Sequence, residues 1–238
     1  MKLFILGILL FLCGGCTDRE NKLIMVTEAS FAPYEYYSDG KIAGIDVDIA
    51  LEIAKELGKK LVVKDVSFES IIHEVKSGKA DIGVAGISFS EERAKQVDFS
   101  LDYVSSRQIV IVKKNNGINS IDEIDNAKIA VQLGSVADMY VSEKYNKKNI
   151  VRHKKYLAAI QDVIDNKADC VVMDELPALQ IVSGNNNLKI LDDALVVDNY
   201  GIIVKKGNEE LLSVINKVIA RLKSEGKIEE YILKHSFE

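Results

Sequence analysis

The sequence has few of the residues that metal sites and disulfide-stabilised domains need. Its histidines, His73, His153 and His235, are isolated and lack the spacing of metal ligands. Cys170 is the only cysteine beyond residue 16, so we expect no disulfide in the chain that follows. The net charge of −5 argues against a nucleic-acid partner, because such a partner needs a basic face.

Sequence motifs of common enzymes are missing as well. The chain has no Gly-x-Ser-x-Gly elbow, no P-loop and no Rossmann glycine pattern. Cys170 lies in an apolar run and has no signature of a nucleophile, so we interpret it as a small buried hydrophobic residue. No Pro-rich or Gly-rich linker divides the chain, so a second domain has to be joined by ordered crossovers. We therefore expect no catalytic residue, no metal and no cofactor.

The N-terminus carries an apolar run from Leu3 to Leu12 behind a single positive charge at Lys2. The run has about half of the ~20 residues that a membrane-spanning helix needs, and it fits the hydrophobic region of a secretory signal. A buried core helix is the alternative, but such a helix is amphipathic and capped. Two small residues before Cys16 resemble a bacterial lipobox, although Cys13 stands where an aliphatic residue is usual. We predict that residues 1–16 are a lipoprotein signal peptide and that Cys16 is acylated.

From residue 22 onward, short β-branched runs alternate with helical patterns, which predicts an α/β fold with mostly parallel, helix-covered sheets. The predicted strands are residues 22–27, 61–66, 80–87, 128–132, 168–173 and 200–205. Helices are expected to begin at caps provided by Asp46, Ser90 and Asn208, and another opens at Gly134-Ser135. A further helix carries Pro177 in its first turn, where proline is tolerated.

Polar groups gather at the ends of the predicted strands, which is where ligands bind in open α/β sheets. One strand end delivers the backbone carbonyls of Ala85 and Gly86 together with the Ser88 hydroxyl, and Arg93 follows five residues later. A second strand ends at Gln132, next to the opening of a helix. These groups are spaced so that several of them can face one ligand.

Together with Ser135, Val136 and Asp174, which follow later strands, these residues suit a zwitterion. The planar fork of Arg93 fits a carboxylate, and the amides of Ser135 and Val136 at the helix opening can donate further bonds. Asp174, at the end of a third strand, and the Ser88 hydroxyl are acceptors for an ammonium group. Two alternatives remain open at this point: Arg93 in a surface ion pair, and Asp174 as an ordinary helix cap.

The segments that contain these residues resemble the amino-acid class of periplasmic-type solute-binding proteins, family 3. The likeness covers residues 22–238, and it is sharpest in residues 31–35, 44–50, 78–88 and 91–100. It implies a two-lobed periplasmic-binding-protein fold of type II, in which the lobes close on the ligand. One lobe would hold residues 22–103 plus 202–238 and the other residues 108–196. Two hinge crossovers, near Val104–Arg107 and Val197–Gly201, would join them.

The resemblance also implies roles for individual residues. Arg93 matches the arginine that binds the ligand α-carboxylate, and Asp174 matches the aspartate that pairs with the α-amine. Phe31 and Phe68 match the positions that sandwich the ligand side chain. The full set of ligand-binding residues implied in this way is Glu28, Phe31, Phe68, Ala85, Gly86, Ser88, Arg93, Gln132, Ser135, Val136 and Asp174.

The function implied is binding of a free amino acid outside the cytoplasm by a monomer, and its delivery to the permease subunits of an ABC importer. Two aromatic faces plus Glu28 suit a cationic side chain such as arginine or lysine, whereas Gln132 equally suits a neutral one such as glutamine. The protein is expected in the periplasm or on the outer face of the cell membrane, held by its lipid. The alternatives are a ligand-sensing module of a signalling system and a dehydratase on the same scaffold.

Overall fold

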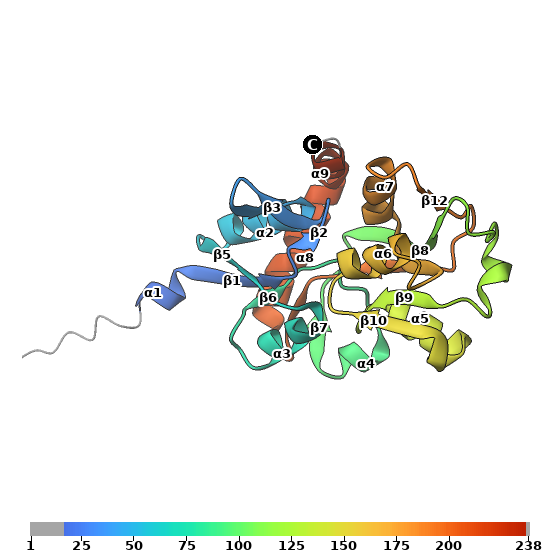
Figure 1. The fold of residues 1–238 in the computed structure, drawn as a ribbon. Helices are drawn as coiled ribbons and strands as arrows, with labels where there is room; N and C mark the ends of the chain where they lie inside the picture. Colours follow the sequence, from blue (N-terminus) through green and yellow to red (C-terminus); the bar gives the residue numbers. More distant parts are fainter. Residues whose placement is uncertain (1–16, 237–238) are drawn as a thin grey trace, which may run out of the picture.

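The computed structural model describes residues 17–236, which form two α/β bodies side by side (Figure 1). We call the body around the first sheet lobe 1 and the body around the second sheet lobe 2. This arrangement confirms the two-lobed α/β fold expected from the sequence. The predictions for the signal peptide and for Cys16 fall on residues 1–16 and lie outside the described residues. Within residues 17–236, every helix is too short or too polar to cross a bilayer.

Lobe 1 is built on a five-stranded sheet with the order β5-β1-β6-β14-β7. Its strands are β1 (Lys22–Thr27), β5 (Lys60–Asp65), β6 (Ile82–Gly83), β7 (Val97–Phe99) and β14 (Ile203–Lys205). A small antiparallel sheet of β2 (Ser30–Phe31), β3 (Glu35–Ser38) and β4 (Lys41–Ala43) follows β1. The C-terminal helices pack on lobe 1 against α2 (Ile45–Glu56), so both ends of the described chain belong to this lobe (Figure 1).

Lobe 2 is built on a six-stranded sheet with the order β10-β9-β11-β8-β12, and β13 pairs with β8 off this path. Its strands are β8 (Val104–Lys113), β9 (Ile129–Gln132), β10 (Ile150–His153), β11 (Cys170–Asp174), β12 (Leu188–Ile190) and β13 (Val196–Tyr200). Strands β9 and β11 are buried along their whole length, which agrees with their β-branched, apolar sequences. Cys170 in β11 is fully buried, as expected, and burial raises the pKa of its thiol to about 12.

Helices cover both sheets. Those of lobe 1 are α1 (Thr17–Glu20), α2 (Ile45–Glu56), α3 (Ile71–Lys76), α4 (Glu91–Ala94), α8 (Glu209–Ser224) and α9 (Lys227–Ser236), with the 3₁₀ turn η1 (Phe68–Ser70). Those of lobe 2 are α5 (Val136–Lys144), α6 (Tyr156–Ile164) and α7 (Glu175–Ser183), with the 3₁₀ turns η2 (Ile121–Ile124) and η3 (Lys147–Asn149). Ser90, Ser135 and Asn208 each cap a helix through the side chain, which confirms the three start signals expected at those positions.

Each of the two large sheets contains antiparallel neighbours as well as the expected parallel ones. In lobe 1, β14 runs antiparallel to both β6 and β7, and in lobe 2, β8 runs antiparallel to β11 and β12. The physical reason is that β8 and β14 are the strands by which the chain enters one lobe from the other. Such strands need no helical crossover to reach their neighbours, so the rule that makes βαβ units parallel does not apply to them.

The two segments that connect the lobes pair with one another. Val104 of β8 is opposite Tyr200 of β13, and Arg107 is opposite Val197, in antiparallel register. The prediction of one strand from Tyr200 to Lys205 was wrong, because β13 ends at Tyr200 in the second sheet and β14 starts at Ile203 in the first. The intervening Gly201 and Ile202 carry the chain from one sheet to the other.

The strand predicted for residues 80–87 is much shorter than its apolar content suggested. Only Ile82 and Gly83 pair in the sheet, and the backbone then turns at Gly86, where φ is +53°. A Cβ on Gly86 would lie 3.0 Å from the Phe31 ring, so the position needs glycine for both its conformation and its space. The turn directs the segment from Ala85 to Ser88 across the edge of lobe 1 that faces lobe 2.

Asp46 does not cap α2, which corrects another expectation from the sequence. The N-cap of α2 is Gly44, where a Cβ would lie 2.1 Å from the Tyr34 carbonyl oxygen. Asp46 lies inside the helix and is fully buried. Its carboxylate accepts hydrogen bonds from the Gly86 N–H at 3.0 Å and from the Tyr103 hydroxyl at 2.9 Å. Asp46 is therefore a buried partner of the strand end and not a surface cap.

Candidate binding cleft between the lobes

A small cavity lies between the two lobes. Its walls come from the strand ends and helix openings of both lobes. Its lining residues are Glu28, Phe31, Glu35, Phe68, Ala85, Gly86, Ser88, Arg93, Gln108, Gln132, Ser135, Val136, Tyr156 and Asp174. Every candidate binding residue expected from the sequence is in this set, so the structure brings all of them to one place.

Arg93 is buried in this cavity, with 6% of its surface exposed. The Ser90 cap fixes the first turn of α4 that carries it, since Ser90 Oγ accepts a hydrogen bond from the Arg93 N–H. The guanidinium donates to the Ser88 carbonyl at 2.6 Å and to the Gly134 carbonyl of lobe 2 at 2.8 Å, and it lies 5.6 Å from the centre of the Phe68 ring. Burial lowers the pKa of this guanidinium, but arginine stays charged in proteins. These contacts rule out the alternative of a surface ion pair.

Asp174 is buried on the lobe 2 side of the cavity. It is the N-cap of α7 by position, yet its side chain makes no capping hydrogen bond. Its carboxylate instead accepts bonds from the Gln108 amide at 2.7 Å and from the hydroxyls of Ser106 and Tyr200. The alternative of an ordinary helix cap is therefore wrong, because the side chain is directed into the cleft and held there by these donors and by the Tyr156 hydroxyl at 3.4 Å.

The pKa of Asp174 is raised to about 7, first because the carboxyl is buried and second because Asp198 lies nearby. Asp198 belongs to β13 and accepts hydrogen bonds from the Ser88 hydroxyl and the Gln108 amide. Burial raises the pKa of Asp198 as well. A cationic group placed next to Asp174 would remove the cost of ionising this pair, so the site is electrostatically suited to an ammonium group.

The opening of α5 forms the part of the cavity wall opposite Arg93. Ser135 caps the helix, accepting a hydrogen bond from the Asp138 N–H at 3.1 Å, and Val136 is its first helical residue. N–H groups in the first turn of a helix lack partners within the helix and carry a partial positive charge. The carbonyl of Gly134 already bonds to Arg93, so α5 and the arginine face the same space.

Glu28, at the end of β1, forms a second polar region of the cavity. Its carboxylate is 2% exposed, and it accepts hydrogen bonds from the Ser30 hydroxyl at 2.6 Å and from the Gln132 amide of lobe 2 at 3.4 Å. Lys155, also of lobe 2, forms an ion pair with it at 3.2 Å. Glu28 therefore contacts lobe 2 through both an amide and an ammonium group.

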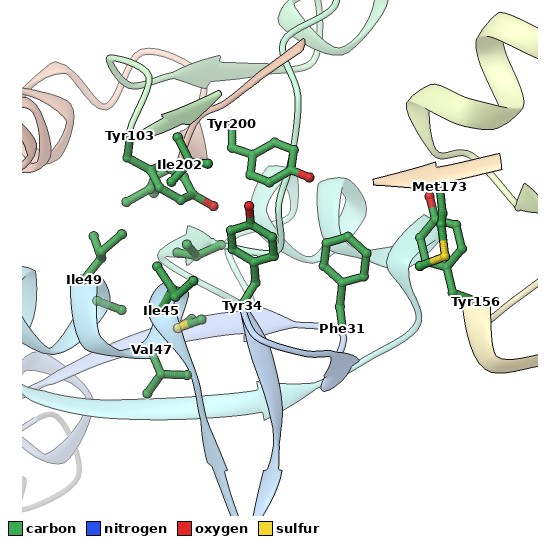
Figure 2. Close-up of a cluster of buried hydrophobic side chains, with 14 of the residues drawn as sticks. Phe31, Tyr34, Ile45, Val47, Ile49, Tyr103, Tyr156, Met173, Tyr200 and Ile202 are labelled. Carbon is green, nitrogen blue, oxygen red and sulfur yellow. The ribbon is translucent and has the colours of Figure 1, made fainter. Parts of the chain in front are cut away.

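Aromatic rings make up the third part of the cavity. Phe31 lies between Tyr34 on one side and Tyr156 of lobe 2 on the other, with ring centres 5.6 and 5.5 Å apart (Figure 2). The hydroxyl of Tyr34 points toward Tyr200 in the same view, and these two rings meet edge to face. The apolar wall is thus shared between the lobes.

Three lining residues were not predicted from the sequence: Glu35, Gln108 and Tyr156. Glu35 lies within residues 31–35, one of the segments where the family resemblance is sharpest, so that position could have identified it as a candidate. Burial and the neighbouring Asp46 raise its pKa well above the usual range, and one of its carboxyl oxygens has no hydrogen-bond partner in residues 17–236. The amide oxygen of Gln108 likewise lacks a partner within that range. Both are buried acceptors at the wall of the cavity.

The geometry combines a cation, two groups of acceptors and an aromatic wall around one small space. Arg93 and the opening of α5 favour an anionic group. Asp174, Ser88 and the buried carboxylates favour a cationic group. Such an arrangement favours a small zwitterion over a nucleotide, a peptide or an apolar ligand.

Comparison with known proteins agrees with this description of the site. The sequence profile of the bacterial extracellular solute-binding proteins, family 3, matches residues 23–237. The arginine-binding extracellular protein ArtP of Bacillus subtilis is 29% identical over 92% of this chain and 89% of its own length. Members of this family, including this relative, are substrate-binding proteins.

Solved structures show the same fold at full length. The substrate-binding protein AbpA of Streptococcus pneumoniae, bound to L-arginine, is 32% identical and superposes with a TM-score of 0.86 over 92% of this chain and 98% of its own. An ancestral arginine-binding protein is 36% identical, with a TM-score of 0.84 over 92% of this chain and 99% of its own, and it has been solved with arginine and with glutamine.

Proposed function

Because the chain belongs to the bacterial extracellular solute-binding proteins of family 3, we propose that it binds a free amino acid outside the cytoplasm and delivers it to an ABC importer. The observation that carries this proposal is the pairing of a buried arginine with a buried aspartate in one cavity between the lobes. Arg93 is 6% exposed and Asp174 is also 6% exposed, and the two line the same space. Their charges match the two ends of an amino acid.

In this proposal Arg93 binds the α-carboxylate with help from the amides of Ser135 and Val136. The hydrogen bonds that Arg93 makes to backbone carbonyls hold its guanidinium in place for such a contact. Asp174, the Ser88 hydroxyl and the backbone of Ala85 and Gly86 accept the α-ammonium group.

The side chain of the ligand extends toward Phe31, Phe68, Glu28 and Gln132 in this proposal. We infer a polar or basic amino acid, with arginine, lysine and glutamine as the first candidates. Relatives named for arginine and for glutamine support this range, and so does the ancestral protein that was solved with both. A Kd of about 1 μM requires only about −8 kcal/mol, which a few paired charges in an enclosed cleft can supply.

Delivery requires that the cleft opens and closes. We propose that residues 22–103 with 202–238 move as one lobe and residues 108–196 as the other. The paired strands β8 and β13, which connect the lobes near Val104–Arg107 and Val197–Gly201, are the proposed hinge. Contacts such as the bond from Arg93 to the Gly134 carbonyl would form on closure.

We also propose that the protein is a monomeric lipoprotein with a signal peptide at residues 1–16. Acylation of Cys16, for example with palmitate, would hold it on the outer face of the cell membrane. Permease subunits of the importer are its proposed protein partners. The support is the apolar run from Leu3 to Leu12 followed by two glycines and Cys16.

A thermal-shift screen of the twenty amino acids tests the proposed function. A ligand bound only by the folded state raises the melting temperature, so one amino acid or a small group should give a clear shift. Arg93→Ala should abolish that shift while leaving a cooperative unfolding transition. A blank screen with folded wild-type protein, or an unchanged affinity in Arg93→Ala, would contradict the proposal.

A further inference from the structure

The ion pair between Glu28 and Lys155 joins a residue inside the cavity to a residue at its edge. The carboxylate of Glu28 is 2% exposed and lines the cavity, whereas the side chain of Lys155 is 50% exposed. The Lys155 ammonium lies 3.2 Å from Glu28 Oε1. Lys155 therefore contacts Glu28 from the exposed edge of the cleft.

The position of Lys155 is fixed by lobe 2. It is the N-cap residue of α6, directly before Tyr156, whose ring packs on Phe31. The neighbouring carbonyl of Lys154 accepts a hydrogen bond from the Gln132 amide at 3.0 Å, and the same amide contacts Glu28. The loop between β10 and α6 is thus tied to the part of the cavity wall that contains Glu28.

The charge of Glu28 is consequently balanced before any ligand side chain arrives. A carboxylate with an ammonium group at 3.2 Å attracts a second cation much less than a lone carboxylate does, because the two cations repel one another. Its hydrogen-bonding capacity is not exhausted, since a carboxylate offers about four acceptor sites and Ser30, Gln132 and Lys155 occupy three of them. A neutral polar side chain can still donate to Glu28, while a cationic one gains less than it would without Lys155.

We propose that Lys155 is a specificity-determining residue of the cleft, because its ammonium offsets the charge of Glu28 and shifts the preference from cationic toward neutral polar side chains. This inference rests on the proposed function and deepens it. The favoured ligand class is an amino acid whose side chain ends in an amide or ureido group.

Lys155 also bridges the lobes, so its removal affects closure as well as charge. An effect on closure changes the affinity for all ligands alike, whereas an effect on the charge of Glu28 changes only the affinity for charged side chains. Arginine and citrulline separate the effect on closure from the effect on charge, since the two amino acids have the same length but end in a guanidinium and a ureido group, respectively. A change in closure alters both affinities by the same factor, so it cancels in the ratio of the two affinities.

Calorimetry of arginine and citrulline binding tests the proposal in four proteins: wild type, Lys155→Met, Lys155→Arg and Lys154→Met. Methionine keeps the apolar stem and removes the charge. We expect Lys155→Met to raise the arginine-to-citrulline affinity ratio by about tenfold, the size of a modest interfacial charge effect. Lys155→Arg keeps the charge and should keep the wild-type ratio. Lys154→Met is the matched control, because that side chain is 78% exposed and its ion pair is with Glu69.

An arginine-to-citrulline affinity ratio in Lys155→Met that is lower than in wild type, or at most about twofold higher, overturns the proposal, because a charge effect large enough to determine specificity exceeds that range. So does a result in which neither ligand binds to any of the four proteins. That last result leaves the proposed function standing if another amino acid raises the melting temperature of the wild type. A screen in which no amino acid does so removes the proposed function itself.

Discussion

The carboxylate of Asp46 accepts a hydrogen bond of 3.0 Å from the backbone N–H of Gly86, forty residues further along the chain. A trans peptide places an N–H and the preceding carbonyl on opposite sides of the bond. The Ala85 carbonyl is therefore directed away from Asp46, and Ala85 lines the cavity. Asp46 orients a carbonyl that we propose as an acceptor of the ligand ammonium group.

Asp46→Ala should lower both the stability of the protein and its affinity for the amino acid. The change leaves the Gly86 N–H and the Tyr103 hydroxyl buried without their acceptor, at a cost of about 1–3 kcal/mol each. Urea unfolding and calorimetry measure the two effects. Glu56→Ala, at the exposed end of the same helix, is the control and should behave like wild type. Full affinity in a folded Asp46→Ala variant would show that Asp46 does not position the strand end.

The ligand-free protein should become less stable as the pH rises from 5 toward 7.5. Burial raises the pKa of Asp46 to about 6 and that of Asp174 to about 7, both above the value of about 3.9 in an unfolded chain. The folded state therefore holds protons that the unfolded state has released. The stabilisation is complete below the unfolded pKa and is lost as the pH rises through the folded values.

Urea unfolding at three pH values between 5 and 7.5 measures this slope. Asp174→Asn should make the slope shallower, because the amide does not titrate. A free energy of unfolding that increases with pH over this interval would mean that the two carboxyls are already ionised in the folded state.

Tyr156 should contribute to ligand affinity mainly through its ring. The ring packs on Phe31 with centres 5.5 Å apart, whereas its hydroxyl makes a long contact of 3.4 Å to Asp174 and a further contact to Ser135. Tyr156→Phe should therefore bind almost as tightly as wild type. Tyr156→Leu should lose about 0.5–1.5 kcal/mol of binding free energy, the usual worth of an aromatic pair. Calorimetry on both variants measures the two binding free energies. An equal loss of affinity in Tyr156→Phe and Tyr156→Leu would assign the effect to the hydroxyl and not to the ring.

Much of the fold and of the candidate site could be predicted from the sequence because strong local patterns mark them. The Ser90 and Ser135 caps start helices where expected, and strand ends place Ser88, Gln132 and Asp174 at one cavity. These positions follow from caps and from runs of buried residues, which depend on neighbours only a few residues away.

The features that could not be predicted depend on contacts between distant segments. Asp46 is a residue type that commonly caps helices. However, Gly44, which lies close to Tyr34, is the N-cap, so the helix starts earlier and the Asp46 side chain is available to accept a hydrogen bond from Gly86. Lys155 is one of many surface lysines in the sequence, and only the packing of α6 against lobe 1 brings it to Glu28. Gln108 acquires its role because β8 pairs with β11 next to Asp174.

The proposed lipid anchor is tested by metabolic labelling with palmitate. Wild-type protein made in bacteria should incorporate the label and partition with membranes, because Cys16 follows two glycines and an apolar run. Cys16→Ser should lose both properties. Cys13→Ser is the matched control and should keep the label. A wild-type protein without label would remove the lipid from the proposed function and leave the binding site unaffected.

Amino-acid affinity should fall as the pH drops below about 7, because the ammonium group needs the ionised form of Asp174. The pKa of that carboxyl is raised to about 7 by burial and by Asp198, so roughly a tenfold weaker binding is expected at pH 6 than at pH 8. Asp198→Asn removes the neighbouring charge, lowers the pKa of Asp174 and should move the profile to lower pH. Asp193→Asn, an exposed carboxylate in the preceding loop, should leave it in place. A profile that Asp198→Asn does not move would show that burial alone raises the pKa of Asp174.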